Sequence, residues 1–140
     1  MPSTPSTPDV AEFVARLLKA TRQNTLAWEP GEAENVLAAD LGHDYSARIA
    51  EVQDFDNESH ESDHILTLYE RDQPVFSVDR RTLGGAELTA ALDERVEFSY
   101  AVFSELWRRA LLKSRRVTDH LEKVNKLLSD RIVTDDDVPF

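Results

Sequence analysis

The spacing of the hydrophobic residues changes twice along this 140-residue chain, and the change limits the folds that it can adopt. Near both ends apolar residues recur every three or four positions, whereas in the middle they alternate with polar residues. The first spacing is typical of amphipathic helices and the second of half-buried strands. A helix, a run of strands and then further helices indicate an α+β fold.

The first helical pattern predicts an amphipathic helix over residues 8–22. Thr7 is placed to cap it, and Pro8 and Asp9 suit a first helical turn. The residues of its apolar face are Val10, Phe13, Val14, Leu17 and Leu18. One such face must pack against another element.

The alternating segments predict a four- or five-stranded antiparallel β-meander. They cover residues 25–29, 35–41, 45–50, 64–70 and 74–78. Turn-forming residues at 30–31, 42–44 and 71–74 separate them. We expect one domain over residues 8–132, a disordered Pro-Ser-Thr tail at 1–7 and a frayed acidic tail at 133–140.

The C-terminal region predicts one long helix or two consecutive helices. No glycine or proline interrupts residues 86–114, and the apolar stripe there is wider than one contact face needs. A heptad-like seam follows, with spacings of four, three and four, at Val117, Leu121, Val124 and Leu128. The seam either continues the long helix or follows a kink between Ser114 and Thr118, where Thr118 could cap a new helix.

Composition and motifs argue against several classes of function. The net charge of −11 disfavours nucleic acid as a partner, and the lack of cysteine excludes disulfides and thiol nucleophiles. No apolar run is long enough to cross a membrane, so we expect a cytoplasmic protein. With no nucleophile elbow and no phosphate-binding glycine loop, we expect a protein that is not an enzyme and uses no cofactor.

The stretch DFDNESHESDH, residues 54–64, is the one candidate metal site. It lacks the glycine and the closing glutamate of an EF-hand loop. His60, Asp63 and His64 remain as weak candidate ligands, because the four-residue spacing of the histidines has meaning only in a helix. We predict a solvated loop whose acids favour the protonated histidines, giving a mild pH response.

A basic cluster stands out in this acidic chain, at Arg108, Arg109, Lys113, Arg115 and Arg116. These bases could stabilise a helix C-terminus or pair with Glu105, Asp119 or Glu122. They could also bind an acidic partner segment. Nucleic acid is the least favoured alternative, because no aromatic residues are interleaved with the bases.

The apolar surplus at the C-terminal end predicts a partner-binding surface. Its candidate residues are Trp107, Leu111, Val117, Leu121, Val124 and Leu128. We expect a protein–protein interaction module that is a homodimer. Two alternatives are a metal- or ligand-responsive domain centred on residues 54–64 and an acidic inhibitor or immunity-type protein.

The order of elements, the small size and the low pI resemble those of acidic type III secretion chaperones. The resemblance implies a small dimeric α+β protein that holds a partner chain without enzymatic turnover. No motif carries it, and the long C-terminal helical region departs from the pattern of that family.

Overall fold

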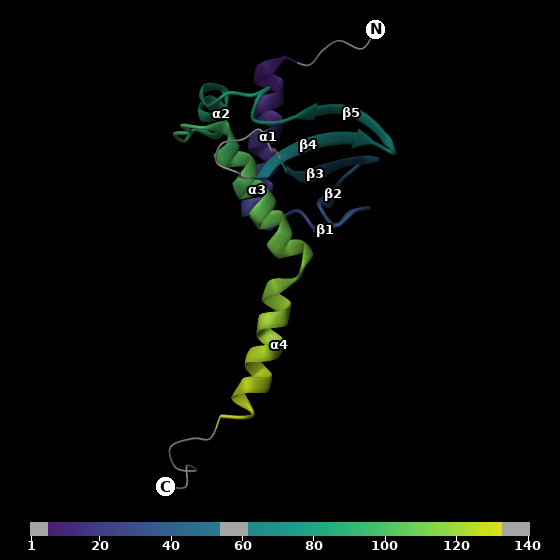
Figure 1. The fold of residues 1–140 in the computed structure, drawn as a ribbon, viewed down its shortest axis with the longest axis vertical. Helices are drawn as coiled ribbons and strands as arrows, with labels where there is room; N and C mark the ends of the chain where they lie inside the picture. Colours follow the sequence, from purple (N-terminus) through teal and green to yellow (C-terminus); the bar gives the residue numbers. More distant parts are fainter. Residues whose placement is uncertain (1–5, 54–61, 133–140) are drawn as a thin grey trace.

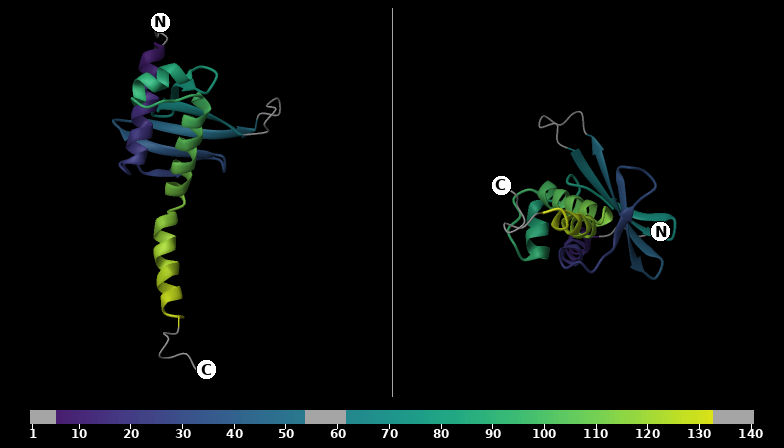
Figure 2. Two further views of the ribbon diagram at one scale, coloured as in Figure 1. Left: turned by 90° about the vertical axis from the view of Figure 1, so that its left-hand side faces the viewer. Right: turned by 90° about the horizontal axis from the view of Figure 1, so that it is seen from below.

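The computed structural model describes residues 6–53 and 62–132 and confirms the α+β fold. Helices cover one face of a five-stranded sheet, and the last helix extends away from this body (Figures 1 and 2). The elements are α1 (Thr7–Arg22), β1 (Trp28–Pro30), β2 (Val36–Gly42), β3 (Tyr45–Gln53), β4 (Ser62–Glu70), β5 (Gln73–Val78), α2 (Gly85–Leu92), α3 (Ser99–Ser114) and α4 (Val117–Ser129). The frayed tail predicted at 133–140 and most of the tail predicted at 1–7 lie outside the described residues.

The sheet is the predicted meander, with five antiparallel strands in chain order. Its register aligns Leu37, Ile49, Leu66 and Val78 in one row across β2 to β5. All four side chains are buried against the helices. Alternation along each strand therefore sends one set of side chains to the core, as the sequence pattern predicts.

Helix α1 begins one residue earlier than predicted. Ser6 is the N-cap, and its hydroxyl accepts a hydrogen bond from the backbone N–H of Asp9 at 3.4 Å. The predicted cap, Thr7, is already helical, so that prediction was wrong. The apolar face packs as expected, with Val14 and Leu18 fully buried.

The stretch predicted as one long helix divides into α2 and α3. Asp93 adopts the left-handed conformation, with φ of 55°, and ends α2 without a glycine. The hydroxyl of Thr89 accepts a hydrogen bond from the N–H of Val96 at 2.9 Å and so fixes the connecting segment. This side-chain contact replaces a helical backbone bond, and apolar periodicity does not report it.

A second break separates α3 from α4, inside the range where the sequence predicts a kink. Arg116 has φ of 50° and is the N-cap of α4, so the prediction that Thr118 caps this helix was wrong. We call residues 113–116 the α3–α4 joint. Among the residues that the structure describes, no helix is both long enough and apolar enough to span a membrane.

Candidate interaction surface on helix α4 and the α3–α4 joint

The side chain of the predicted partner-binding residue Val117 lies outside the part that the structure describes, and the other five differ in exposure. Trp107 is 7% exposed and belongs to the core, and Leu111 packs partly against that core. These two side chains therefore contribute to the packing of the body, and Trp107 has little surface left for a partner. Leu121, Val124 and Leu128 in α4 are 54%, 47% and 50% exposed.

Helix α4 presents an apolar stripe that no described part of its own chain covers. We define the α4 stripe as Leu121, Val124, Leu127 and Leu128. Leu127 is 59% exposed, and Ile132, just beyond the helix, is 71% exposed. The four-three-four spacing of the seam did not predict that Leu127 and Ile132 belong to this apolar surface. A helical wheel over residues 117–132 would have placed both beside the seam.

Most charged residues of α4 lie away from the stripe. Asp119, Glu122 and Lys126 are exposed and occupy the opposite face of the helix by their spacing, whereas the exposed Lys123, four residues before Leu127, lies at the edge of the stripe. Asp119 lies four residues before Lys123, and Glu122 lies four residues before Lys126. Each pair brings an acid beside a base on the helix surface, which stabilises the helix modestly. The positions that flank the seam hold His120, Asn125 and Leu127. Neither these positions nor the seam positions 117, 121, 124 and 128 contain an aspartate, glutamate, lysine or arginine.

One member of the predicted basic cluster has the internal role that the sequence suggests. Arg109 Nε donates to Glu105 Oε2 at 2.7 Å. Glu105 also accepts from Arg22 of α1 at 2.7 Å, and Arg22 reaches Glu94 at 2.9 Å. Hydrogen bonds from Arg22 and then Arg109 lower the pKa of Glu105 to about 2, against the opposing effect of burial. This network ties α1 to α3.

The other four bases of the cluster have no carboxylate partner among the described residues. Within residues 6–53 and 62–132, the ion pairs do not include Arg108, Lys113, Arg115 or Arg116. Lys113 Nζ donates instead to the backbone carbonyl of Leu26 at 3.2 Å. The α3–α4 joint therefore keeps a local positive charge on an acidic protein.

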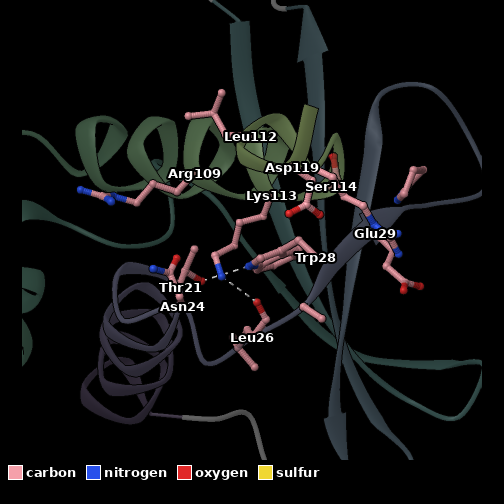
Figure 3. A pocket seen from close by; sticks show the side chains of 13 residues that line it. Thr21, Asn24, Leu26, Trp28, Glu29, Arg109, Leu112, Lys113, Ser114 and Asp119 are labelled. Atoms are coloured by element: carbon pink, nitrogen blue, oxygen red, sulfur yellow. Dashed lines mark hydrogen bonds between the residues drawn. The ribbon is translucent and has the colours of Figure 1, made fainter. Parts of the chain in front are cut away.

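An open pocket of about 640 Å³ lies at this joint, between α1, β1 and α3. Figure 3 shows the Lys113 side chain reaching into it beside Trp28 and Thr21. Trp28 Nε1 donates to Thr21 Oγ1 at 3.0 Å, so this wall of the pocket is a buried, hydrogen-bonded pair. Arg109 and Arg116 line the pocket as well, together with Glu29 and Asp119, so its lining contains three bases and two acids.

The candidate metal ligands do not form a site in the described part of the chain. Asp63 and His64 belong to strand β4 rather than to a loop, because β3 and β4 pair as far as Gln53 and Ser62. Asp63 pairs with Arg80, and adjacent strand residues point to opposite faces. His60 lies outside the described residues, and no cluster of three metal-ligating side chains occurs within them.

His64 is a buried histidine rather than a loop histidine. It is 8% exposed and stacks near Trp107 with ring centroids 5.5 Å apart. Burial lowers its pKa, and Glu51, whose Oε2 is 3.6 Å from Nε2, opposes the shift only in part. The prediction that neighbouring acids favour protonated His64 was therefore wrong, because desolvation outweighs their attraction.

Comparisons with protein-family models, with curated proteins and with solved structures gave no match to this chain.

Proposed function

We propose that this protein is a non-enzymatic interaction module that forms a homodimer through helix α4. The observation that carries the proposal is the α4 stripe, which is about half exposed from Leu121 to Leu128 while the apolar face of α3 is buried. An exposed apolar stripe on a helix that extends from the body is typical of a protein-binding surface.

The length of α4 supports the proposal. A helix of 13 residues is marginal in water unless its apolar face is packed. Covering one leucine side chain stabilises a structure by about 1.5–3 kcal/mol relative to full exposure. The side chains of the α4 stripe are about half exposed, so a partner helix would recover a large part of this free energy.

The charge pattern supports a second copy of the same chain as the partner. Two proteins that each carry a net charge of −11 repel each other at long range. Because the seam positions and the positions that flank them contain no aspartate, glutamate, lysine or arginine, two α4 helices can pair through a two-fold axis without placing like charges opposite each other at the seam. The contact is short, so we expect a dissociation constant in the micromolar range.

Solution mass tests this proposal. Light scattering from about 1 µM to 1 mM should show wild-type monomers converting into dimers over that range. Leu121→Asp combined with Val124→Asp should remain monomeric, while circular dichroism shows that the body is still folded. The matched control, Lys126→Asp with Ser129→Asp, adds two aspartates away from the stripe and should dimerise like the wild type. A wild type that stays monomeric at every concentration would overturn the proposal.

A further inference from the structure

Four of the five bases in the cluster at the end of α3 and the α3–α4 joint have no carboxylate partner among the described residues. Residues 108–116 contain five bases and no acid. Of these bases, Arg109 alone is ion-paired among the described residues. Arg109, Lys113 and Arg116 line the pocket at the joint, together with Glu29 and Asp119. A carboxylate-bearing segment would find several donors close together there.

The sequence contains an acidic segment of matching size just beyond α4. Residues 134–140 read TDDDVPF, with Asp135, Asp136 and Asp137 in a row and no base. These residues lie outside the described part of the chain, and their charge and their position follow from the sequence. The segment begins five residues after the last residue of α4, Ser129.

The orientation of the α4 pair decides whether the bases and acids meet. In a parallel pair, the two basic clusters would lie at one end and the two acidic segments at the other, so that like charges face each other. In an antiparallel pair, each acidic segment leaves α4 beside the joint of the second copy. Opposite charges then meet at both ends, which favours the antiparallel arrangement.

The heptad spacing specifies the register of an antiparallel pair. All four seam positions find a partner when position 117 faces 128 and position 121 faces 124 of the second copy. The C-terminal end of each α4 then lies beside the α3–α4 joint of the second copy. The register that buries the seam therefore brings the point where the acidic segment follows α4 of one copy near the bases of the other.

We infer that α4 pairs in the antiparallel orientation and that residues 134–140 of one copy bind the basic cluster of the other. This inference rests on the α4 homodimer proposed above and specifies its geometry. In this arrangement, the bases of the cluster that have no carboxylate partner in the described part of their own chain bind carboxylates of a second chain. The acidic segment thereby adds electrostatic attraction to a short apolar contact.

Charge reversal in two matched chains tests the inference. One chain carries Arg108→Glu and Arg115→Glu, and the other carries Asp135→Lys and Asp137→Lys. Analytical ultracentrifugation at low salt should show that each chain alone dimerises about tenfold more weakly than the wild type, because like charges now meet at both ends. An equimolar mixture should form heterodimers with affinity close to that of the wild type. High salt should reduce all these differences.

A control separates this effect from net charge. Arg16→Glu with Arg95→Glu makes the same change in net charge at two exposed sites on the body, whose arginines are 78% and 85% exposed. This variant should dimerise nearly as well as the wild type. If it is weakened as much as the Arg108 and Arg115 variant, general repulsion explains the loss and the inference is wrong.

The remaining outcomes separate the inference from the proposed function. A monomeric wild type would overturn both. A wild-type dimer that both charge reversals leave unchanged would retain α4 pairing and overturn the binding of the acidic segment. In a third outcome, mixing the two charge-reversed chains does not restore dimerisation, but one chain that carries all four substitutions dimerises like the wild type. The acidic segment would then contact the basic cluster of its own chain, and the inference would be wrong.

Discussion

Helices α3 and α4 follow each other directly, and both are amphipathic, yet only α3 has its apolar face covered. Phe103 and Leu106 of α3 are fully buried against α1 and the sheet, whereas Leu121 and Leu128 of α4 are half exposed. Figure 1 shows why, because α4 leaves the body at the α3–α4 joint. An apolar stripe thus shows that a face needs a partner, but not whether the same chain provides it.

The largest effect on stability should come from breaking the covered helix. Phe103→Ala removes a fully buried ring and should lower the free energy of unfolding by about 3–5 kcal/mol. Urea denaturation followed by circular dichroism measures this loss. Leu112→Ala, on the same helix at a side chain that is 57% exposed, is the control and should cost far less. Equal losses would mean that α3 is not packed as described.

A smaller effect should follow from removing the carboxylate between α1 and α3. Glu105→Gln leaves Arg22 and Arg109 without their shared partner and should cost about 1–3 kcal/mol at pH 7. The folded protein holds the pKa of Glu105 at about 2, below its ordinary value of 4.5. The stabilisation is therefore complete above about pH 4.5 and is lost as the pH falls towards 2.

Unfolding measured from pH 7 to pH 2 checks the sign of this linkage. The difference in stability between the wild type and Glu105→Gln should shrink as the solution becomes acidic. A difference that stays constant across this range would show that the charge of Glu105 does not contribute.

Protonation of His64 should also change the free energy of unfolding with pH, by less than the loss of Glu105 does. Burial lowers its pKa below 6.5, so the unfolded chain binds the proton more readily than the folded one. Stability should fall as the pH drops below about 6.5 and level off once it is below the pKa of the folded state. Replacing the imidazole in His64→Gln should remove this component between pH 7 and 5. A wild-type stability that rises over the same interval would contradict the account.

The smallest effect on the stability of the monomer should come from the uncovered helix. Leu121→Ala should change the free energy of unfolding of dilute protein by no more than about 0.5 kcal/mol, because its side chain has few neighbours. The same substitution should weaken dimerisation measurably by sedimentation. A large loss of stability in the monomer would mean that α4 folds back onto the body in solution.

The sequence predicts much of the body because its local signals agree with one another. Alternation in Leu37, Ala39, Ala47 and Ile49 predicts strands, and these four side chains are indeed buried in the sheet. The break at Asp93 was not predictable, since it depends on a left-handed aspartate and on the hydroxyl of Thr89 rather than on glycine or proline. Such contacts join residues that no periodic pattern relates.

The candidate site was only partly predictable for a related reason. The seam spacing identifies Leu121, Val124 and Leu128 correctly as one face, and the structure shows that face exposed. The burial of Trp107 and of His64 depends on their meeting across the interface between α3 and β4. Sequence spacing contains no information on that contact, so it did not predict the burial of either residue.

Hydrogen–deuterium exchange of α3 and α4 at two protein concentrations tests the central claim most directly. If a second copy covers the α4 stripe, the amides of α4 should exchange fast in dilute protein and become protected as the concentration rises through the dissociation constant. The amides of α3 should be protected equally at both concentrations. Rapid exchange in α4 at every concentration, or full protection in dilute protein, would contradict the account.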